Sequence, residues 1–300
     1  MKKILLLLLF FSLQMIAQQD PQYTQYMYNM NVINPAYAGS QETLSIGLLG
    51  RTQWVGIDGA PTTFTGAIHA PVSKALGAGF SVIHDEAGPL KETNFYADFS
   101  YTIRWNQKYN WAFGVKGGLT MLNFDLAALN QIPPGLLNTD IQKTHGNFGL
   151  GTFFYTDKYY IGASVPNVLK STYFETSDGE YENASEEVHF FVTGGYVFDL
   201  TKNIKFKPAT FLKIVENSPI TFDVTANFLF SEKLGLGVAY RWEDAVSGLV
   251  SFVVAPNLTL GYSYDYTISK LYDYSHGSHE VFLQFSLDLS KGDLKSPRFF

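Results

Sequence analysis

The segment "NFYADFSYTIRW" (Asn94–Trp105) alternates between apolar side chains and polar or small ones. Phe95 and Phe99 fall on one face, and Asp98 and Arg104 fall on the other. Because successive side chains of a β-strand point to opposite faces of its sheet, the segment predicts a strand with one apolar and one polar face. Its length suits a tilted strand that crosses a membrane, which needs about 9–11 residues, better than the roughly five or six of a soluble sheet.

The same alternation recurs along the chain, in "TFDVTANFLF" (221–230), "LTLGYSYDYTI" (258–268) and "EVFLQFSLDL" (280–289). No segment with a helical period competes with it, and no break in composition divides the chain, so we expect one domain. The runs predicted as strands are residues 42–50, 62–70, 77–84, 93–105, 111–123, 146–156, 159–169, 187–199, 204–215, 219–231, 233–242, 246–255, 258–268 and 279–289.

The links between these runs alternate in length. After every second run the link is tight: "PVSKAL", "NQKYN", "DK", "LTKN", "SEK" and "PN". Most others are long, such as "RTQWVGIDGAP", "HDEAGPLKE" and "SKLYDYSHGS", with "ENSP" a short exception. Short periplasmic turns and long outer loops are typical of outer-membrane barrels, whereas a secreted β-sandwich has no reason to keep this parity. The pattern predicts an all-β transmembrane outer-membrane β-barrel of about 14 antiparallel strands, with both termini periplasmic.

The composition agrees with a membrane barrel. Charged residues make up 16% of the chain, below the roughly 25% of soluble domains, and aromatic residues also make up 16%. The chain has no cysteine, which excludes disulfides, thiol catalysis and zinc–thiolate sites. A formal net charge of −6 gives no reason to expect a nucleic-acid partner.

The first residues predict export. Met1–Ala17 contains two lysines, a short apolar run and a small residue at its end, the pattern of a signal peptide cleaved near Ala17. The apolar run is too short for a comfortable transmembrane helix, which needs about 20 residues. We therefore expect location in the outer membrane, with outer-membrane lipid around the barrel.

The faces predicted to point inward are rich in Gly, Ser and Thr, and they carry Lys116, Lys205, Lys207 and Lys213. About 14 strands enclose more space than one side-chain core needs, so a polar or water-filled lumen is expected. These lysines leave open the alternative that the lumen passes an anionic solute.

The six histidines do not predict a catalytic or metal site. His84 lies at a strand end, and His276 and His279 bring two ligands together only on a helix, whereas a metal needs three or four. A membrane-embedded hydrolase would need a serine beside His69 or His189 on the outer face, and nothing in the sequence supplies one. We expect no enzyme, no cofactor and no metal.

The chain is thus divided into a signal peptide (1–17), a polar and aromatic segment (18–40), the barrel (41–290) and a periplasmic tail (291–300). The segment 18–40 has no apolar period, and Asn34-Pro35 and Gly39 predict turns in it. Its tyrosines offer flat surfaces with polar ends, and it has too many aromatic residues for a disordered linker. We expect it to dock on the periplasmic rim or to plug the lumen.

Three motifs resemble the PorP/SprF family of the type IX secretion system in Bacteroidetes: "DPQYTQYMYNMNVINPAYAGS" (20–40), "RTQWVGIDGAPTTF" (51–64) and the ending "SPRFF" (296–300). The resemblance covers essentially the whole mature chain. It implies a non-enzymatic accessory barrel that helps to secrete or retain a cell-surface protein, such as a gliding-motility adhesin, through the C-terminal signal domain of that cargo. It also implies contact with secretion subunits of the periplasmic ring or of its peptidoglycan-linked parts.

The motif residues are the candidates for partner or plug contacts. The rival function is a small-solute or fatty-acid transport channel, since such channels also have about 14 strands and a plug-like N-terminus. The candidates are Asp20, Pro21, Gln22, Tyr26, Asn34, Pro35, Ala36, Tyr37, Gly39, Arg51, Trp54, Pro297 and Arg298.

Overall fold

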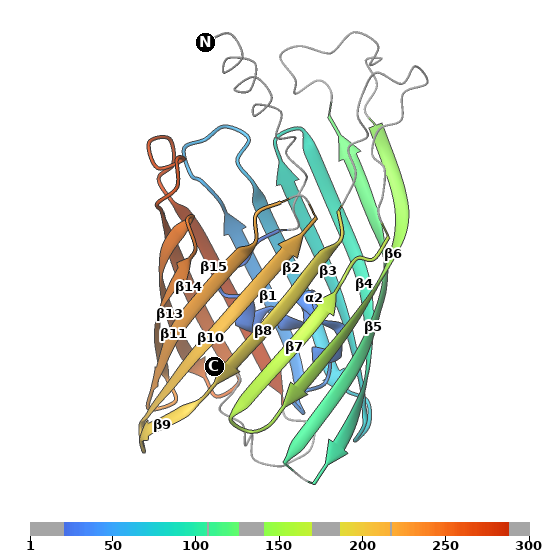
Figure 1. The fold of residues 1–300 in the computed structure, drawn as a ribbon, viewed down its shortest axis with the longest axis vertical. Coiled ribbons are helices and arrows are strands. Elements are labelled where there is room, and N and C mark those ends of the chain that lie inside the picture. The colour runs from blue at the N-terminus through green and yellow to red at the C-terminus, as the bar shows by residue number, and fades with distance from the viewer. Residues whose placement is uncertain (1–20, 107, 126–140, 170–186, 217, 288–300) are drawn as a thin grey trace, which may run out of the picture.

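The strands form one antiparallel sheet that closes on itself, as the computed structural model shows (Figure 1). The structure describes residues 21–106, 108–125, 141–169, 187–216 and 218–287. Closure comes from the first and last strands, which pair from Leu44↔Leu287 to Thr52↔His279. The strands are β1 (Leu44–Thr52), β2 (Thr62–Pro71), β3 (Leu76–Ala87), β4 (Leu90–Trp105), β5 (Tyr109–Phe124), β6 (Ile141–Tyr155), β7 (Tyr159–Val165), β8 (His189–Tyr196), β9 (Phe198–Thr201), β10 (Ile204–Val215), β11 (Thr221–Phe230), β12 (Leu234–Arg241), β13 (Ala245–Ala255), β14 (Leu258–Thr267) and β15 (Ser278–Leu287).

The barrel wall has fourteen strand positions, because β8 and β9 are two parts of one interrupted strand. Both pair with β10, and only Val197 separates them. Val197 is not paired with β10, and its N–H donates to the Lys158 carbonyl at 2.7 Å. The prediction of an all-β antiparallel barrel of about 14 strands is confirmed.

One end of the barrel carries only tight turns, which we call the short-turn end. They comprise residues 72–75, 106–108, 156–158, 202–203, 231–233 and 256–257. The expected long link over "HDEAGPLKE" at the opposite, long-loop end is wrong. There β3 and β4 stay paired as far as Ala87↔Leu90, so that Gly88 and Pro89 alone make the turn.

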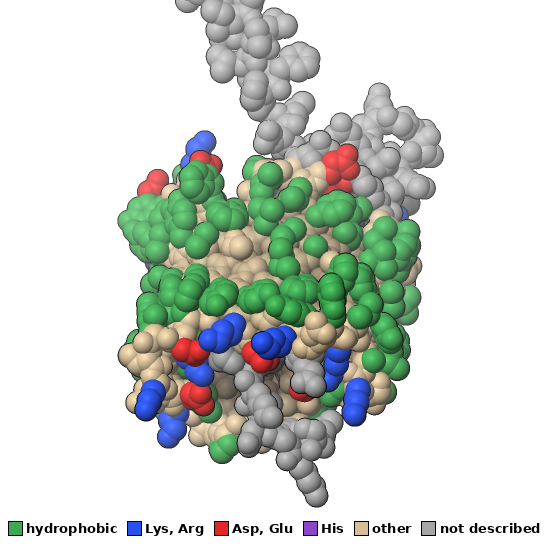
Figure 2. Space-filling model, turned by 60° about the horizontal axis from the view of Figure 1, so that its bottom comes forward, with side chains coloured by type: hydrophobic (Ala, Val, Ile, Leu, Met, Phe, Trp, Pro, Cys, Tyr) green, Lys and Arg blue, Asp and Glu red, His purple; other side chains and the backbone are tan. Residues whose placement is uncertain are grey.

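The two faces of the strands divide as the alternation predicts. On β4, Phe99 is 62% exposed and points outward, whereas Asp98 is fully buried and points into the barrel. Apolar side chains cover much of the visible outer wall, and charged residues gather near the rim of the short-turn end (Figure 2). None of the helices in the described part of the chain is long and apolar enough to cross a membrane.

The main cluster of buried apolar side chains lies inside the barrel. Three short helices, η1 (Tyr26–Tyr28), α2 (Met30–Ile33) and η2 (Pro35–Tyr37), cross the interior at mid-height (Figure 1). We call residues 21–43 the lumenal segment. Its core includes Tyr26 and Ala36, both with no exposed surface.

Candidate functional site

Local sequence shapes the lumenal segment. Pro35 occupies the first turn of η2, where its missing N–H costs nothing, and the Asn34 side chain caps that helix by accepting the Ala36 N–H at 3.0 Å. Gly39 has a φ of +74°, a conformation that suits glycine. The turns predicted at Asn34-Pro35 and at Gly39 are confirmed.

A buried ion cluster holds the start of the segment near the long-loop end. It consists of five wall residues: Arg51, Asp223, Arg241, Asp265 and Glu280. Arg51 reaches Asp265 at 2.8 Å and Glu280 at 3.2 Å, and Arg241 reaches Asp223 at 3.1 Å. Two guanidinium groups therefore face three carboxylates, which leaves carboxylate oxygens in need of donors.

The lumenal segment supplies those donors. The Thr24 and Gln25 N–H groups donate to the two carboxylate oxygens of Glu280, at 2.9 and 2.7 Å. The Thr24 hydroxyl donates to Asp265 at 2.7 Å and accepts from Arg51 at 3.0 Å. Because a buried charge is costly unless its hydrogen bonds are made, the wall cluster and the segment stabilise each other.

A second polar contact lies halfway along the segment. The Lys116 ammonium pairs with Asp98 at 2.8 Å and lies over the Tyr96 ring, 4.8 Å from its centroid. Asn31 completes the arrangement. Its side-chain amide donates to Asp98 at 3.2 Å, and its backbone carbonyl accepts from Lys116 at 3.5 Å. The buried cation is thus shared between the wall and the segment.

Glycines in the wall make room for the end of the segment, and we call Gly77, Gly114 and Gly151 the glycine seat. A Cβ atom on any of them would lie less than 3.0 Å from Ala38, Ala36 or Asn34 respectively, closer than real Cβ atoms approach. They come from β3, β5 and β6, so three separate strands are shaped to one bend of the segment. Serines close the contact: Ser100 donates to the Ala38 carbonyl at 2.6 Å, and Ser164 donates to the Ile33 carbonyl at 2.9 Å.

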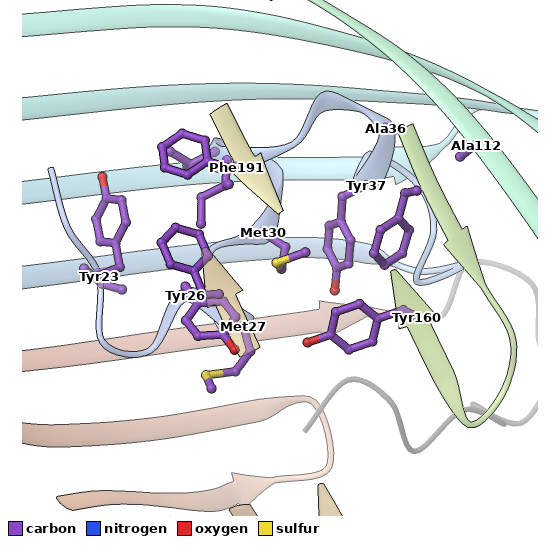
Figure 3. Close-up of a cluster of buried hydrophobic side chains, with 14 of the residues drawn as sticks. Tyr23, Tyr26, Met27, Met30, Ala36, Tyr37, Ala112, Tyr160 and Phe191 are labelled. Atoms are coloured by element: carbon purple, nitrogen blue, oxygen red, sulfur yellow. The ribbon is translucent and has the colours of Figure 1, made fainter. Parts of the chain in front are cut away.

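Aromatic rings of the wall pack against the tyrosines of the segment. Tyr28 stacks on Phe282 with ring centroids 3.9 Å apart, and Tyr26 stacks on Phe211 at 4.9 Å. Tyr37 meets Phe153 edge to face at 5.3 Å. Figure 3 shows the tyrosines and methionines of the segment gathered with Tyr160 and Phe191 of the wall.

The lumen is filled at the height of the segment. Two cavities border it within the described part of the chain, one beside Gln25 and one beside Asn31, and each has a volume of about 10 Å³. A space of that size holds roughly one water molecule. Of the two expected interiors, polar or water-filled, the structure shows a polar one at this height, where side chains of the segment fill the space.

Most of the candidate residues converge on the lumenal segment and its contacts. Tyr26, Asn34, Pro35, Ala36, Tyr37 and Arg51 are buried, and Pro21, Gln22 and Gly39 are half-buried. Trp54 lies apart, in the loop between β1 and β2, where its backbone N–H donates to the Ser278 hydroxyl. The loop continues into a short pairing with the β14–β15 loop, through Val55, Gly277 and His276. Asp20, Pro297 and Arg298 lie outside the described residues.

Sequence reasoning selected Arg51 but missed most of the other wall residues that receive the segment. The signal was an aromatic residue out of phase with its strand, such as Phe282 between Glu280 and Gln284 on the polar face of β15. Asp223, Arg241, Asp265 and Glu280 also point inward. Their charges on a face expected to be lumenal are the signal that could have identified them.

Two of the strand histidines, His69 and His189, are buried and point inward. His69 is buried against Tyr37, with ring centroids 5.4 Å apart, and accepts the Gly39 N–H at 3.3 Å. His189 is fully buried, and its ring contacts the Glu187 carbonyl. Within the described ranges, no group of three or more His, Cys, Asp or Glu residues is placed to hold a metal ion.

A family model for the type IX secretion system membrane protein PorP/SprF matches residues 15–285. This chain belongs to the PorP/SprF family. The match extends from the lumenal segment through β14 and most of β15, so the barrel and its filling are both parts of the family pattern. The resemblance to the family is confirmed over residues 15–285, which include the first two motifs but not the ending at 296–300, and the chain is an outer-membrane β-barrel of type IX secretion. Among curated proteins, none matches the chain.

Solved structures with a similar fold are membrane barrels. The Ralstonia pickettii toluene transporter TbuX is 12% identical with a TM-score of 0.53, over 86% of this chain and 92% of that one. The CymD monoaromatic hydrocarbon channel is 13% identical with a TM-score of 0.52, over 88% and 92%. The Pseudomonas putida toluene transporter TodX is 12% identical with a TM-score of 0.50, over 90% and 95%. At these identities the likeness concerns the fold alone.

Proposed function

We propose that this PorP/SprF barrel is a non-enzymatic accessory component of type IX secretion that helps to secrete or retain one cognate cell-surface protein. The short turns and the end of β15 face the periplasm. The long loops face outward, where they hold the C-terminal signal domain of the cargo, and the lumenal segment begins near that side. The leader is removed near Ala17. On the periplasmic side the barrel meets subunits of the periplasmic ring or its peptidoglycan-linked parts.

The filled lumen is the observation that carries this proposal. A polypeptide cargo needs a wide path, and the lumenal segment occupies the interior with contacts on β1 through β7 and on β10, β14 and β15. Displacing it would break a buried ion cluster and several hydrogen bonds at once, so the segment is suited to permanent closure. A closed barrel acts on cargo through its surfaces.

The segment residues Pro21–Gly39 are, on this proposal, plug contacts with the barrel itself. Their burial leaves the long loops and the short-turn rim as the surfaces for partners. Trp54 belongs to the loop that pairs with the β14–β15 loop, which offers a rigid edge for cargo.

An affinity pull-down of the tagged barrel from its native envelope, followed by mass spectrometry, tests the proposal. Recovery of a large secreted protein with a C-terminal signal domain, or of periplasmic ring subunits, is the expected outcome. Deletion of loop residues 55–60 should abolish recovery of the cargo and leave recovery of the ring subunits intact. A barrel that comes out alone would contradict the accessory role.

The rival function, a solute channel, makes the opposite prediction in planar bilayers. The filled lumen predicts no steady conductance from the intact chain. Sustained passage of solutes by the intact chain would replace the accessory role with transport.

A further inference from the structure

The outer wall carries an apolar groove that the lumenal segment and the loops do not explain. It crosses β4 to β8 near the short-turn end and has a volume of about 440 Å³. That volume lies within the roughly 300–1,000 Å³ of pockets that bury a small ligand. Its lining is almost wholly carbon.

The strand register creates the groove. One cross-strand row carries the large side chains Trp111, Phe154 and Ile161, whereas the adjacent row carries Thr152, Ala163 and Val192. All six line the groove, together with Trp105 and Tyr109 at its short-turn end. A ridge of large side chains beside a row of small ones leaves a channel on a wall that otherwise presents bulky side chains.

Apart from the Trp105 indole and the Tyr109 hydroxyl, the side chains that line the groove have no hydrogen-bond donor left for a water molecule. The Thr152 hydroxyl accepts from the Trp111 indole N–H at 2.7 Å and donates to the Ala112 carbonyl at 3.2 Å. These bonds use the one donor of the indole and the one donor of the hydroxyl. An apolar space without polar partners stays dry or takes an apolar occupant.

A belt of aromatic rings places the groove at a membrane boundary. Tyr109, Phe154, Tyr159 and Tyr196 follow one another across β5 to β8, with successive centroids 6.1, 6.3 and 6.0 Å apart. Such belts mark the interface between hydrocarbon and water in membrane barrels. The groove therefore opens to acyl chains at one end and to headgroups at the other.

The short-turn rim is positively charged. Five of the six tight turns contain one exposed lysine, Lys74, Lys108, Lys158, Lys202 or Lys233, against two acidic residues, Asp157 and Glu232. Lys108 directly precedes Tyr109 of the groove, and among the described residues it forms no ion pair. Lys158, in the adjacent turn, bonds Asp199 at 3.0 Å, and that hydrogen bond raises its pKa, so it stays charged.

We propose that this groove is a binding site for one anionic phospholipid, with an acyl chain between Trp111 and Ala163 and the headgroup at Lys108. The shape and dryness of the groove select the chain, and the lysines of the rim select the charge. The site ties the barrel to the leaflet at its short-turn end, independently of any cargo.

Retention of lipid by the purified full chain tests the site. Native mass spectrometry after exchange into detergent should show one phosphatidylglycerol per barrel when that lipid is supplied. Ala163→Phe fills the groove and should lower retention about tenfold. Ala97→Phe is the matched control, because Ala97 is also an exposed alanine on the lipid face but lies outside the groove, and retention should not change.

The headgroup contact has its own control pair. Lys108→Gln should weaken phosphatidylglycerol retention about fivefold, the usual effect of one cation near an anionic surface, and should leave phosphatidylcholine unaffected. Lys233→Gln removes an exposed lysine from the β11–β12 turn, which is separated from the β4–β5 turn by several strands, and should change neither. Folding of each variant is checked by the heat-dependent shift of the barrel in gel electrophoresis.

Equal retention by Ala163→Phe and Ala97→Phe would overturn the site. Retention of lipopolysaccharide in place of phospholipid would assign the groove to another lipid and would also overturn the proposal. Equal retention of phosphatidylcholine and phosphatidylglycerol by the unaltered chain would remove the role of Lys108.

Discussion

The two ends of the lumenal segment are held by opposite physical means. Near the long-loop end, Thr24 and Gln25 complete a cluster of buried charges on β1, β11, β12, β14 and β15. Near the short-turn end, Ile33–Ala38 fits against three glycines and two serines. One end depends on charge balance, whereas the other depends on shape.

The difference predicts how each end responds to mutation. A buried ion cluster tolerates no missing member, because the partner that remains is left charged without compensation. A close-packed backbone contact tolerates no added atom, since protein interiors have few voids. Chymotrypsin is a suitable probe of both ends, because the lumenal segment contains tyrosines but no lysine or arginine.

Arg51→Ala should have the largest effect. Glu280 loses its guanidinium partner and Asp265 loses the nearer of its two, and removal of one member of a buried pair typically costs about 3–5 kcal/mol. We expect a lower urea midpoint for unfolding and chymotrypsin cleavage after Tyr23 and Tyr26. Arg51→Lys keeps the charge and should recover part of the loss. An unchanged midpoint in Arg51→Ala would show that the cluster does not hold the segment.

Gly114→Val should expel the other end of the segment. The new Cβ would overlap the Ala36 backbone, and overpacking of this kind typically costs about 1–3 kcal/mol. Cleavage after Tyr37 and the onset of conductance in planar bilayers are expected. Gly117→Val is the control on the same strand, because no atom lies within 4 Å of its added Cβ. If neither variant conducts in planar bilayers, the glycine seat does not keep the lumen closed.

Ser100→Ala should have a smaller effect at the same end. It removes one hydrogen bond to the Ala38 carbonyl, 2.6 Å long, which contributes about 1 kcal/mol. The rate of chymotrypsin cleavage after Tyr37 should rise about fivefold, while cleavage after Tyr23 stays slow. Equal increases at both tyrosines would mean that the two ends release together, and the contrast between them would fail.

Glu42→Gln should have the smallest effect. Glu42 and Arg104 form an ion pair at 3.0 Å, with 66% and 47% of their side chains exposed. Exposed pairs contribute roughly 0–1 kcal/mol and weaken in salt. The urea midpoint should barely move, and 1 M salt should remove the remaining difference from the unaltered chain. A loss as large as that of Arg51→Ala would show that exposure does not separate the two kinds of pair.

The barrel wall was predictable from residues alone. Alternation in Asn94–Trp105 sets Phe99 outward and Asp98 inward, and the tight turns after every second strand indicate the antiparallel barrel architecture. Strand ends were less predictable, because β3 and β4 continue their pairing through polar residues whose composition predicts a loop. The interruption at Val197 had no signal in the sequence that we recognised.

The contents of the barrel depend on the tertiary structure. Composition marked residues 18–40 as aromatic and poorly charged, and that reading left both a rim and a lumen position open. Only the closed sheet brings Gly77, Gly114 and Gly151 together around Asn34–Ala38, since they come from strands whose register cannot be read from local sequence. Periodicity determines which way a side chain points, because it acts within one strand. What the side chain meets inside depends on closure, because closure joins strands more than 200 residues apart, as Arg51 and Asp265 show.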